Sequence, residues 1–350
     1  MKALAIKPRT PGSARVVELP KPKPQAGEVL VDVVEVGICG TDAEISDGLY
    51  GEAPPGSELL VLGHEILGRL ENGDLVVPMV RRPCGRCGHC KAGSQDMCDS
   101  GEFTERGIKA VHGGLCEFFA EAPDMLIPVP AKARSYAVLL EPMSVVAKGL
   151  RHSLLIQKRL DWRPKRALVL GAGPIGLLAT LNLRLLGWDV VTAARRPKTS
   201  EKARIVRAAG ARYHSVAEVS LEAMAKEGAA FDLIFEATGS SQVAFDSIHL
   251  LAANGVLCLT SVTGGTKTAP VPIDRINCEL VLGNKLMFGT VNAGRVDFID
   301  GLATLEKIEA AFPGLLASLL TARVSFGDVD RLFEVQKSGI KTVFAVSPGV

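Results

Sequence analysis

Four cysteines lie within fifteen residues of this 350-residue chain, in the run Cys84-x₂-Cys87-x₂-Cys90-x₇-Cys98. Thiolates at this spacing can close a tetrahedral shell around zinc and leave no position open for a substrate. Bacterial iron–sulfur clusters also use closely spaced cysteines, but their run has a shorter last gap and a proline after the final cysteine. Asp99 follows Cys98 here. The run therefore predicts a structural zinc site.

A second group of candidate metal ligands is dispersed along the chain: Cys39, the neighbours His64 and Glu65, and Glu141. One thiolate, one imidazole and one or two carboxylates leave a position open for water or substrate, as a catalytic zinc requires. Taken singly, Cys39 would be a small buried apolar residue and His64 a hydrogen-bonded core histidine. Their joint occurrence, with a nucleotide motif downstream, favours a metal site.

That nucleotide motif is Gly171-Ala172-Gly173-Pro174-Ile175-Gly176, which fits the pattern G-x-G-x-x-G. It follows a short apolar strand candidate, 167–170, and opens a helical segment, 174–186, which is the context that a dinucleotide site needs. The three glycines permit a tight turn, a close approach to the pyrophosphate and close helix–strand packing. The alternative is a tight turn in some other α/β protein.

The segment Ala194-Arg195-Arg196 stands where an NAD-selective site carries an acidic residue for the ribose 2′-hydroxyl. Two guanidinium groups suit a 2′-phosphate instead, because they make forked hydrogen bonds to phosphate oxygens. The sequence therefore predicts NADP binding, with NAD use retained. The alternative is that Arg195 and Arg196 are solvated surface charges.

The elements that must position these groups change character near residue 155. Residues 1–155 are rich in short apolar runs, Gly and Pro, with a strand candidate at 28–36, and predict a β-rich domain. Residues 156–292 alternate strands with helices and predict βαβ units and a parallel sheet. Beyond the first, the expected strands are 190–193, 231–235, 256–259 and 285–288, with helices around 201–209 and 240–252.

Composition excludes several classes of protein. Lys and Arg total 40 and Asp and Glu total 38, so the formal net charge is +2 and gives no nucleic-acid footprint. The longest uncharged apolar stretch, 167–183, contains three glycines and a proline and is short for a membrane span. Crowded cysteines in such a chain indicate a metal in a reducing compartment rather than disulfides. We expect a cytoplasmic protein with no membrane or nucleic-acid partner.

Over essentially its whole length the chain resembles the zinc-containing medium-chain dehydrogenases, and it is most similar to their archaeal-type glucose 1-dehydrogenases. The family motifs are Gly-Ile-Cys-Gly-Thr-Asp at 37–42, Gly-His-Glu at 63–65, the four-cysteine run, Glu141-Pro142, the glycine motif, and Phe231-Asp232 through Ala237-Thr238-Gly239. The subfamily motifs are Thr104-Glu105-Arg106-Gly107-Ile108, Ala194-Arg195-Arg196-Pro197 and Phe288-Gly289-Thr290-Val291-Asn292.

The resemblance implies an α/β fold with two domains. Residues 1–155 would form a GroES-like β-rich catalytic zinc domain to which residues 293–350 return, and residues 156–292 a dinucleotide-binding Rossmann domain with a doubly wound parallel sheet. It implies two zinc ions per chain and a homo-oligomer, either a dimer or a tetramer. Cys39, His64 and Glu65 would hold the catalytic zinc, with Glu141 as a fourth ligand or a partner of bound water. Substrate contacts would come from Thr41, Glu105, Glu141 and Asn292, and further cofactor contacts from Thr260, Ser261, Val262, Thr290, Val291 and Asn292.

The implied reaction is oxidation of an aldose, D-glucose or D-galactose, at C1 to the lactone, with NADP or NAD. The chain departs from the subfamily pattern at Ala194, where Asn is common, and at Val145, where Asp occurs; a sugar-binding His near 282–283 is absent. The alternatives are a polyol, amino-alcohol or simple alcohol dehydrogenase of the same family and, from another class, a non-enzymatic NADP-binding redox sensor.

Overall fold

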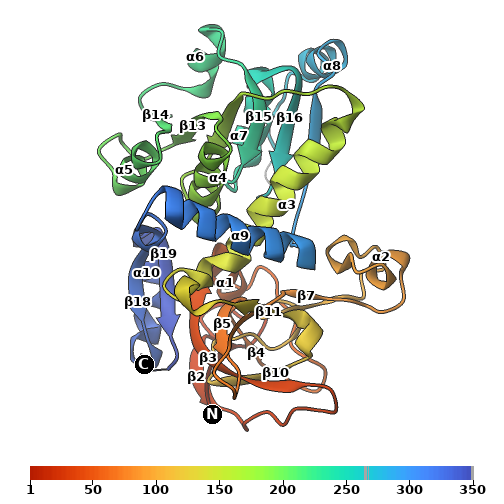
Figure 1. Cartoon of the computed structure of the whole chain (residues 1–350), viewed down its shortest axis with the longest axis vertical. Helices are drawn as coiled ribbons and strands as arrows, with labels where there is room; N and C mark the ends of the chain where they lie inside the picture. The colour runs from red at the N-terminus through yellow and green to blue at the C-terminus, as the bar shows by residue number, and fades with distance from the viewer. Residues whose placement is uncertain (264–265, 267, 348–350) are drawn as a thin grey trace. The chain divides into compact units, whose positions relative to one another are not determined.

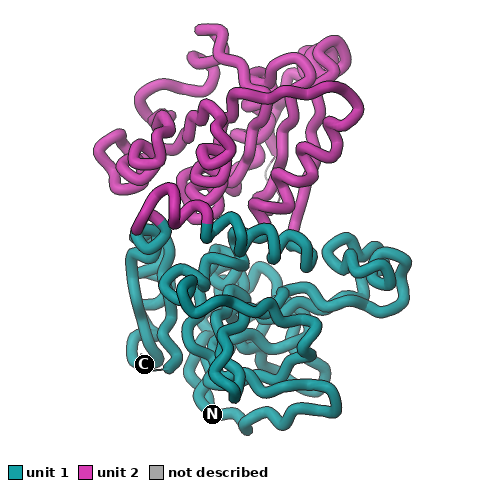
Figure 2. The backbone as a smooth tube through the Cα atoms, viewed as in Figure 1, with its two compact units in different colours: residues 1–144, 292–306, 316–350 teal, residues 145–291, 307–315 magenta. Residues whose placement is uncertain are grey.

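A computed structural model describes residues 1–263, 266 and 268–347 of the chain. It divides into two compact units, drawn in different colours in Figure 2. Unit 1 comprises Met1–Ser144, Asn292–Glu306 and Leu316–Val350; unit 2 comprises Val145–Val291 and Lys307–Leu315. The first division falls inside helix α3 (Leu140–Ile156), whereas the sequence prediction divided the chain at 155/156 and 292/293.

Unit 1 is built on a seven-stranded sheet of order β11-β6-β5-β3-β19-β18, with β10 also paired to β3 (Figure 1). The long central strand β3 (Val29–Ile38) is rich in β-branched residues and buried along most of its length, as a strand covered on both faces must be. Its neighbours are β5 (Glu65–Arg69), β6 (Leu75–Pro78), β10 (Phe118–Glu121), β11 (Leu126–Val129), β18 (Leu320–Val324) and β19 (Lys341–Ala345).

Two small sheets complete unit 1. One joins β1 (Lys2–Ile6), β2 (Arg15–Glu18) and β4 (Leu60–Val61), and its strand β1 lies in the same apolar core as β3. The other joins β7 (Arg81–Arg82), β8 (Thr104–Arg106) and β9 (Ala110–Val111). The helices of this unit include α1 (Gly40–Ser46), α2 (Gly88–Lys91), the 3₁₀ turn η1 (Gln95–Met97), the start of α9 (Arg295–Ala311) and α10 (Leu332–Ser338).

Unit 2 is a six-stranded parallel sheet of order β14-β13-β12-β15-β16-β17. The strand order reverses direction at β12, which is the doubly wound arrangement that binds dinucleotides at the carboxyl ends of its strands. Thr180 of α4 meets Thr192 on one face of the sheet, and Gly149 of α3 packs against Phe235 and Cys258 on that same face. Ile276 and Leu280 of α8 pack with Leu168 and Ile234 on the opposite face. The strands are β12 (Arg166–Leu170), β13 (Asp189–Ala194), β14 (Arg212–Ser215), β15 (Phe231–Glu236), β16 (Leu251–Leu259) and β17 (Leu286–Gly289).

The helices of unit 2 include α4 (Pro174–Leu185), α5 (Glu201–Ala208), α6 (Leu221–Lys226), α7 (Ser241–Asp246) and α8 (Ile273–Leu282). The predicted α/β fold class is confirmed, but the helix predicted at 240–252 is too long. Helix α7 ends at Asp246, a 3₁₀ turn follows, and the chain already pairs as strand at Leu251, opposite Phe231. This pairing overrides the local helical pattern. No helix among the described residues is long and apolar enough to cross a membrane.

Candidate active site

Two loops of unit 1 bring the dispersed candidate ligands together. Strand β3 ends at Ile38, and Cys39 then caps the N-terminus of α1. The buried Asp42 carboxylate accepts the Cys39 N–H at 2.9 Å and the Gly63 N–H at 3.0 Å. Asp42 therefore ties the loop that carries Cys39 to the loop that carries His64.

The same carboxylate faces the His64 ring. Asp42 Oδ1 lies 3.6 Å from His64 Nδ1, and both side chains are buried. Burial acts against both charges, yet their mutual attraction prevails, so the pKa of His64 is raised and that of Asp42 lowered. A carboxylate beside Nδ1 favours a proton there and leaves Nε2 as the nitrogen for a metal.

Glu65 begins β5, and both of its oxygens accept from Lys341 Nζ of β19, at 2.7 Å and 2.5 Å. Lys341 Nζ also donates to the Ile38 carbonyl oxygen at 3.2 Å, and both side chains of the pair are 2 % exposed. This pair fixes the carboxylate beside the end of β3. One ligand atom each from Cys39, His64 and Glu65 lies within 4.8 Å of the others. Thiolate, imidazole and carboxylate at that spacing fit zinc with an open position.

Glu141 stands beside this group without joining the set of ligand atoms within 4.8 Å. It lies at the start of α3 and is buried. Burial, with the charges of Glu65 and Asp42, raises its pKa to about 7, while His64 and Lys341 act in the opposite direction. A carboxyl group so placed suits a partner of water or substrate at the metal's open position.

Thr41 is the first link in a chain of hydroxyl groups in α1 and the loop that follows it. Its side chain lies close enough to Tyr50 to act on the pKa of the phenol, and the Tyr50 hydroxyl donates to Glu44 Oε2 at 2.8 Å. Burial, with Glu44 adding to it, raises the pKa of Tyr50 well above its ordinary value. Tyr50 therefore stays protonated and can pass a proton only in concert with its neighbours.

The four-cysteine run folds into a lobe with α2 and η1. Cys84, Cys87, Cys90 and Cys98 place their sulfur atoms within 4.8 Å of one another. Backbone N–H groups of residues 86, 87 and 90 donate to the Cys84 and Cys87 sulfurs at 3.4 Å. The Cys87 N–H bond, with others, lowers the pKa of Cys84 to about 5, whereas burial raises that of Cys90 to about 12. A bound cation would favour the thiolate form of both Cys84 and Cys90. The four sulfurs therefore fit a closed zinc site.

Glu105 and Asn292, the candidate sugar-binding residues, contact each other. Asn292 Nδ2 donates to Glu105 Oε1 at 2.8 Å, and Asn292 Oδ1 accepts the Ala293 N–H at 2.9 Å. Asn292 has φ 61°, a left-handed conformation that asparagine adopts more readily than most residues. One Nδ2 hydrogen of Asn292 is left for a substrate hydroxyl.

The glycine motif of unit 2 has the geometry that its sequence predicts. Gly171 has φ 102°, and a Cβ there would lie 2.5 Å from the Ala237 carbonyl oxygen. A Cβ at Gly176 would lie 1.9 Å from the Gly171 carbonyl oxygen, whereas one at Gly173 would meet nothing within 4 Å. Gly173 therefore leaves open space before the N-terminus of α4, where a pyrophosphate binds.

Arg195 and Arg196 follow β13 and are exposed. Among the described residues neither guanidinium group has an ion-pair or hydrogen-bond partner, although the Arg196 carbonyl oxygen accepts from Tyr213 Oη at 2.8 Å. Lys202 of α5 lies close enough to Arg196 that burial and this neighbouring charge lower its pKa. The end of β13 therefore carries two arginine side chains that no Asp or Glu side chain among the described residues neutralises.

The remaining candidate cofactor residues follow β16 and β17. Thr260 Oγ1 donates to the Glu236 carbonyl oxygen at 2.6 Å, and Ser261 Oγ donates to the Glu236 carboxylate. Val262 and Val291 are exposed, and Thr290 Oγ1 is buried without a partner among the described residues. The sequence did not single out Glu236, which is buried at the carboxyl end of β15 and also accepts the Thr238 N–H at 2.6 Å.

Three other residues of the site also escaped sequence reasoning: Asp42, Tyr50 and Lys341. Asp42 is part of the quoted motif 37–42, so its position beside Cys39 was a usable signal. Lys341 lies 276 residues from Glu65 and stands in a strand without any motif, so only the pairing of β19 with β3 reveals it.

Comparisons with known proteins agree with this geometry. Residues 25–131 match the alcohol dehydrogenase GroES-like domain, and residues 134–346 match the family described as glucose dehydrogenase C-terminus. The chain is 47% identical to a glucose 1-dehydrogenase of Methanocella arvoryzae and 41% identical to one of Caldivirga maquilingensis, with 99% of each chain covered. The structure of Haloferax mediterranei glucose dehydrogenase in complex with NADP, Zn and gluconolactone has a TM-score of 0.92 and 32% identity, with both chains fully covered.

Proposed function

This chain belongs to the zinc-containing medium-chain dehydrogenases and is similar within them to the archaeal-type glucose 1-dehydrogenases, and from that premise we propose that it oxidises D-glucose at C1 to the lactone with NADP or NAD. The single observation that carries the proposal is the buried group of Cys39, His64 and Glu65. Its three donors leave a coordination position open, which chemistry on a hydroxyl group requires and a structural site does not.

When bound there, zinc supplies Lewis-acid polarisation of the C1 hydroxyl and the nicotinamide accepts hydride. The residues of this chain prepare that chemistry before substrate arrives. The Asp42 carboxylate lies 3.6 Å from the His64 ring, and Lys341 holds the Glu65 carboxylate at 2.5 Å and 2.7 Å. Fixed ligands reduce the reorganisation needed as charge develops on the substrate oxygen.

The proton of the C1 hydroxyl would leave through Thr41. The Thr41 hydroxyl group would donate to the neighbouring Tyr50 hydroxyl, and Tyr50 Oη donates to Glu44 Oε2 at 2.8 Å. A concerted shift along this chain places the proton on the Glu44 carboxylate, which is partly exposed to solvent. Tyr50 need not ionise in such a shift, in keeping with its raised pKa.

A sugar substrate is favoured by the polar groups near Asn292 and Glu105. Among the described residues, Glu105 Oε2 receives no hydrogen bond and Asn292 keeps one N–H free. A site built to hydrogen-bond substrate hydroxyls rejects an analogue that lacks them, because its polar groups are then unpaired. A simple alcohol would leave these groups without partners. D-Galactose differs from D-glucose only at C4, so it is the second substrate to test.

Most of the residues proposed for cofactor binding lie in unit 2. The glycine motif Gly171–Gly176 would take the pyrophosphate, and Arg195 and Arg196 the 2′-phosphate of NADP. Residues Thr260–Val262 and Thr290–Asn292 would contact the nicotinamide half, with Glu236 positioning the first of these segments through Ser261.

Self-association would use the free edge of the parallel sheet. Strand β17 is an edge strand, and its residue Met287 is 38% exposed. On the adjacent helix α8, Ile273, Val281 and Leu282 are between 64% and 77% exposed. An exposed strand edge beside apolar side chains is a template for pairing with a second copy. Light scattering on the purified protein tests for the expected dimer or tetramer.

The function is tested by a spectrophotometric screen of aldoses and polyols at 340 nm, with NADP and NAD separately. We expect the highest kcat/KM with D-glucose and formation of gluconolactone. A Cys39→Ser variant serves as the control for background reduction. Faster turnover of simple alcohols than of every sugar would indicate a simple alcohol dehydrogenase of the same family. A lack of turnover with every alcohol tested would favour a non-catalytic NADP-binding protein.

A further inference from the structure

Arg81 of β7 is a buried arginine whose guanidinium group is fixed on several sides. Its Nε and Nη2 lie 3.0 Å and 2.9 Å from Glu105 Oε1. Its Nη1 donates to the Asp96 carbonyl oxygen at 3.0 Å, and the guanidinium carbon lies 3.8 Å from the centre of the Phe103 ring. A planar guanidinium held by two directed hydrogen bonds, an ion-pair contact and a ring face has one orientation available.

The two carboxylate oxygens of Glu105 differ in their hydrogen bonding. Oε1 accepts from Arg81 and from Asn292 Nδ2, and is saturated. In the part of the chain that the structure describes, Oε2 accepts no hydrogen bond. The Glu105 side chain is 13% exposed, so this second oxygen keeps an opening to a ligand. An ionised carboxylate with one oxygen fixed and one open is a directed acceptor for a hydroxyl group.

Strand β8 has a second anchor besides this ion pair, which joins directly paired residues of β7 and β8. The next residue, Arg106, is anchored on its own by the Glu121 carboxylate, 2.7 Å away, and by the His112 carbonyl oxygen at 2.9 Å. Successive side chains of a strand point to opposite faces. Arg106 therefore holds β8 to β10, and the Arg81–Glu105 contact on the other face is available to set the direction of one carboxylate.

The third Arg81 contact reaches the cysteine lobe. Asp96 is buried and lies in η1, between Cys90 and Cys98. Its side chain also packs closely against Gly294, where an added Cβ would lie 2.7 Å from Asp96 Oδ1. The backbone of the lobe sets the position of the Asp96 carbonyl oxygen, and this oxygen orients the Arg81 guanidinium group. The guanidinium group in turn orients the Glu105 carboxylate.

We propose that Arg81 is a positioning residue that aims Glu105 Oε2 at a hydroxyl group of the sugar, and that through Asp96 it couples the four-cysteine lobe to substrate specificity. The lobe then does more than stabilise the fold. This inference rests on the proposed function, since it deepens the role of Glu105 in sugar binding.

The experiment compares Arg81→Gln and Arg81→Lys with a matched control, Arg86→Gln. Arg86 is an exposed arginine of the same lobe whose side chain pairs with Glu102 at the surface. We expect Arg81→Gln to raise the KM for glucose by roughly ten-fold or more, as loss of a charge-assisted contact predicts, with a smaller change in kcat. The KM for NADP and the zinc content should not change. Arg81→Lys, which keeps the charge but not the fork, should recover part of the loss.

Two further readouts separate positioning from a general structural effect. Glucose affinity measured by calorimetry without cofactor should fall in Arg81→Gln by the same factor as KM rises. In a panel of deoxyglucoses, the sugar that lacks the hydroxyl bound by Glu105 should show nearly the same kcat/KM in wild type and Arg81→Gln. In a Glu105→Gln background, Arg81→Gln should add little, because the two changes remove one contact.

The outcomes distinguish the two proposals. If Glu105→Gln leaves the glucose KM unchanged, the assignment of Glu105 to the substrate fails and the coupling fails with it. If Glu105→Gln raises KM while Arg81→Gln and Arg81→Lys do not, the sugar assignment stands and the positioning role is overturned. The positioning role is also overturned if Arg81→Gln and Arg86→Gln raise the KM for glucose equally. The same holds if Arg81→Gln lowers the zinc content and leaves glucose affinity unchanged, since Arg81 would then act only in the structure of the lobe.

Discussion

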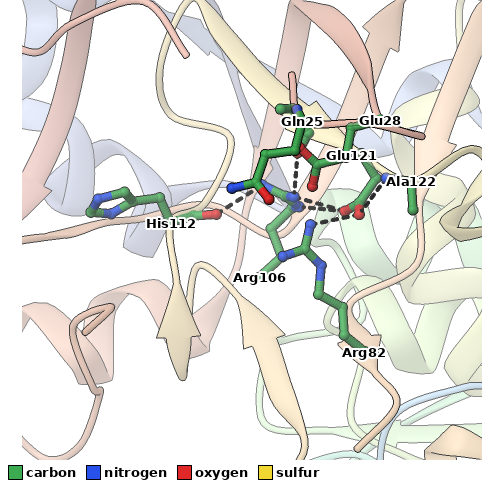
Figure 3. Close-up of polar contacts among 8 residues, drawn as sticks. Gln25, Glu28, Arg82, Arg106, His112, Glu121 and Ala122 are labelled. Atoms are coloured by element: carbon green, nitrogen blue, oxygen red, sulfur yellow. Dashed lines mark hydrogen bonds and ion pairs between the residues drawn. The ribbon is translucent and has the colours of Figure 1, made fainter. Parts of the chain in front are cut away.

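The Arg106 guanidinium lies 2.7 Å from the Glu121 carboxylate, and both side chains are 2% exposed. Arg82 approaches the same carboxylate, so one buried anion faces two cations; Figure 3 shows both arginine side chains pointing toward it. A buried charge whose partner is removed is strongly destabilising. We therefore expect Glu121→Gln to lower the free energy of unfolding by about 3–5 kcal/mol, measured by denaturant titration. Glu117→Gln, on a neighbouring carboxylate at the surface, should change it little.

The same pair predicts a pH dependence. Burial acts to raise the pKa of Glu121, but Arg106 and Arg82 prevail and the pKa is lowered from its ordinary value of 4.5. A carboxyl group with a lowered folded-state pKa contributes stability that is present above the unfolded pKa and lost as pH falls through the folded one. The difference in stability between wild type and Glu121→Gln should therefore be full above pH 4.5 and shrink below it. A difference that grows on acidification would contradict the assignment of charge.

The two metal groups predict opposite effects of cysteine removal. Cys39→Ser should leave about one zinc per chain, abolish turnover and keep the fold, because only the open group is changed. Zinc content by atomic emission and the thermal midpoint together test this. Loss of both ions from Cys39→Ser would show that the two sites are not independent.

Cys87→Ser should chiefly reduce stability, since a structural zinc contributes folding free energy directly. The expected result is a lowered thermal midpoint that added zinc does not restore. If the thermal midpoint were unchanged and turnover were lost, the lobe would have a catalytic rather than a structural role.

Tyr50→Phe tests the proposed proton route. Removing the hydroxyl that links Thr41 to Glu44 should lower kcat by roughly ten-fold or more, toward the lower end of the contribution of general acid–base catalysis. The KM for glucose and the zinc content should stay near wild type, because Tyr50 is not expected to contact either. An unchanged kcat, in a variant whose turnover is limited by hydride transfer, would remove Tyr50 from the route.

The sequence predicted those features that are encoded by local spacing. The cysteine run, the glycine motif and the strand–helix alternation of unit 2 each depend on neighbours within about twenty residues. The contacts that it missed join distant segments: Lys341 to Glu65, and Arg81 to Glu105. The helix predicted at 240–252 failed for a similar reason, because Leu251 pairs with Phe231 in the sheet, and no local pattern reveals that pairing. Side-chain partners of this kind depend on topology.

Cofactor preference is predicted from what surrounds Arg195 and Arg196. Both are exposed after β13, and no carboxylate among the described residues pairs with them. Two unpaired cations attract a 2′-phosphate and do not repel the 2′-hydroxyl of NAD, so both cofactors should be used, with NADP used at least as well. A charge-assisted hydrogen bond contributes on the order of 1.5–3 kcal/mol, which corresponds to about ten-fold or more in affinity.

The variant Arg195→Ala/Arg196→Ala should therefore raise the KM for NADP selectively and leave that for NAD nearly unchanged. Arg204→Ala is the matched control, because its side chain pairs with Glu201 on the exposed face of α5. The NADP effect should also weaken as salt is added, since exposed charges are screened. Lys202, whose pKa is lowered by burial and by Arg196, would retain part of the phosphate affinity in the double variant. Equal changes for both cofactors, or none, would show that the arginines are surface charges and that another group selects the nucleotide.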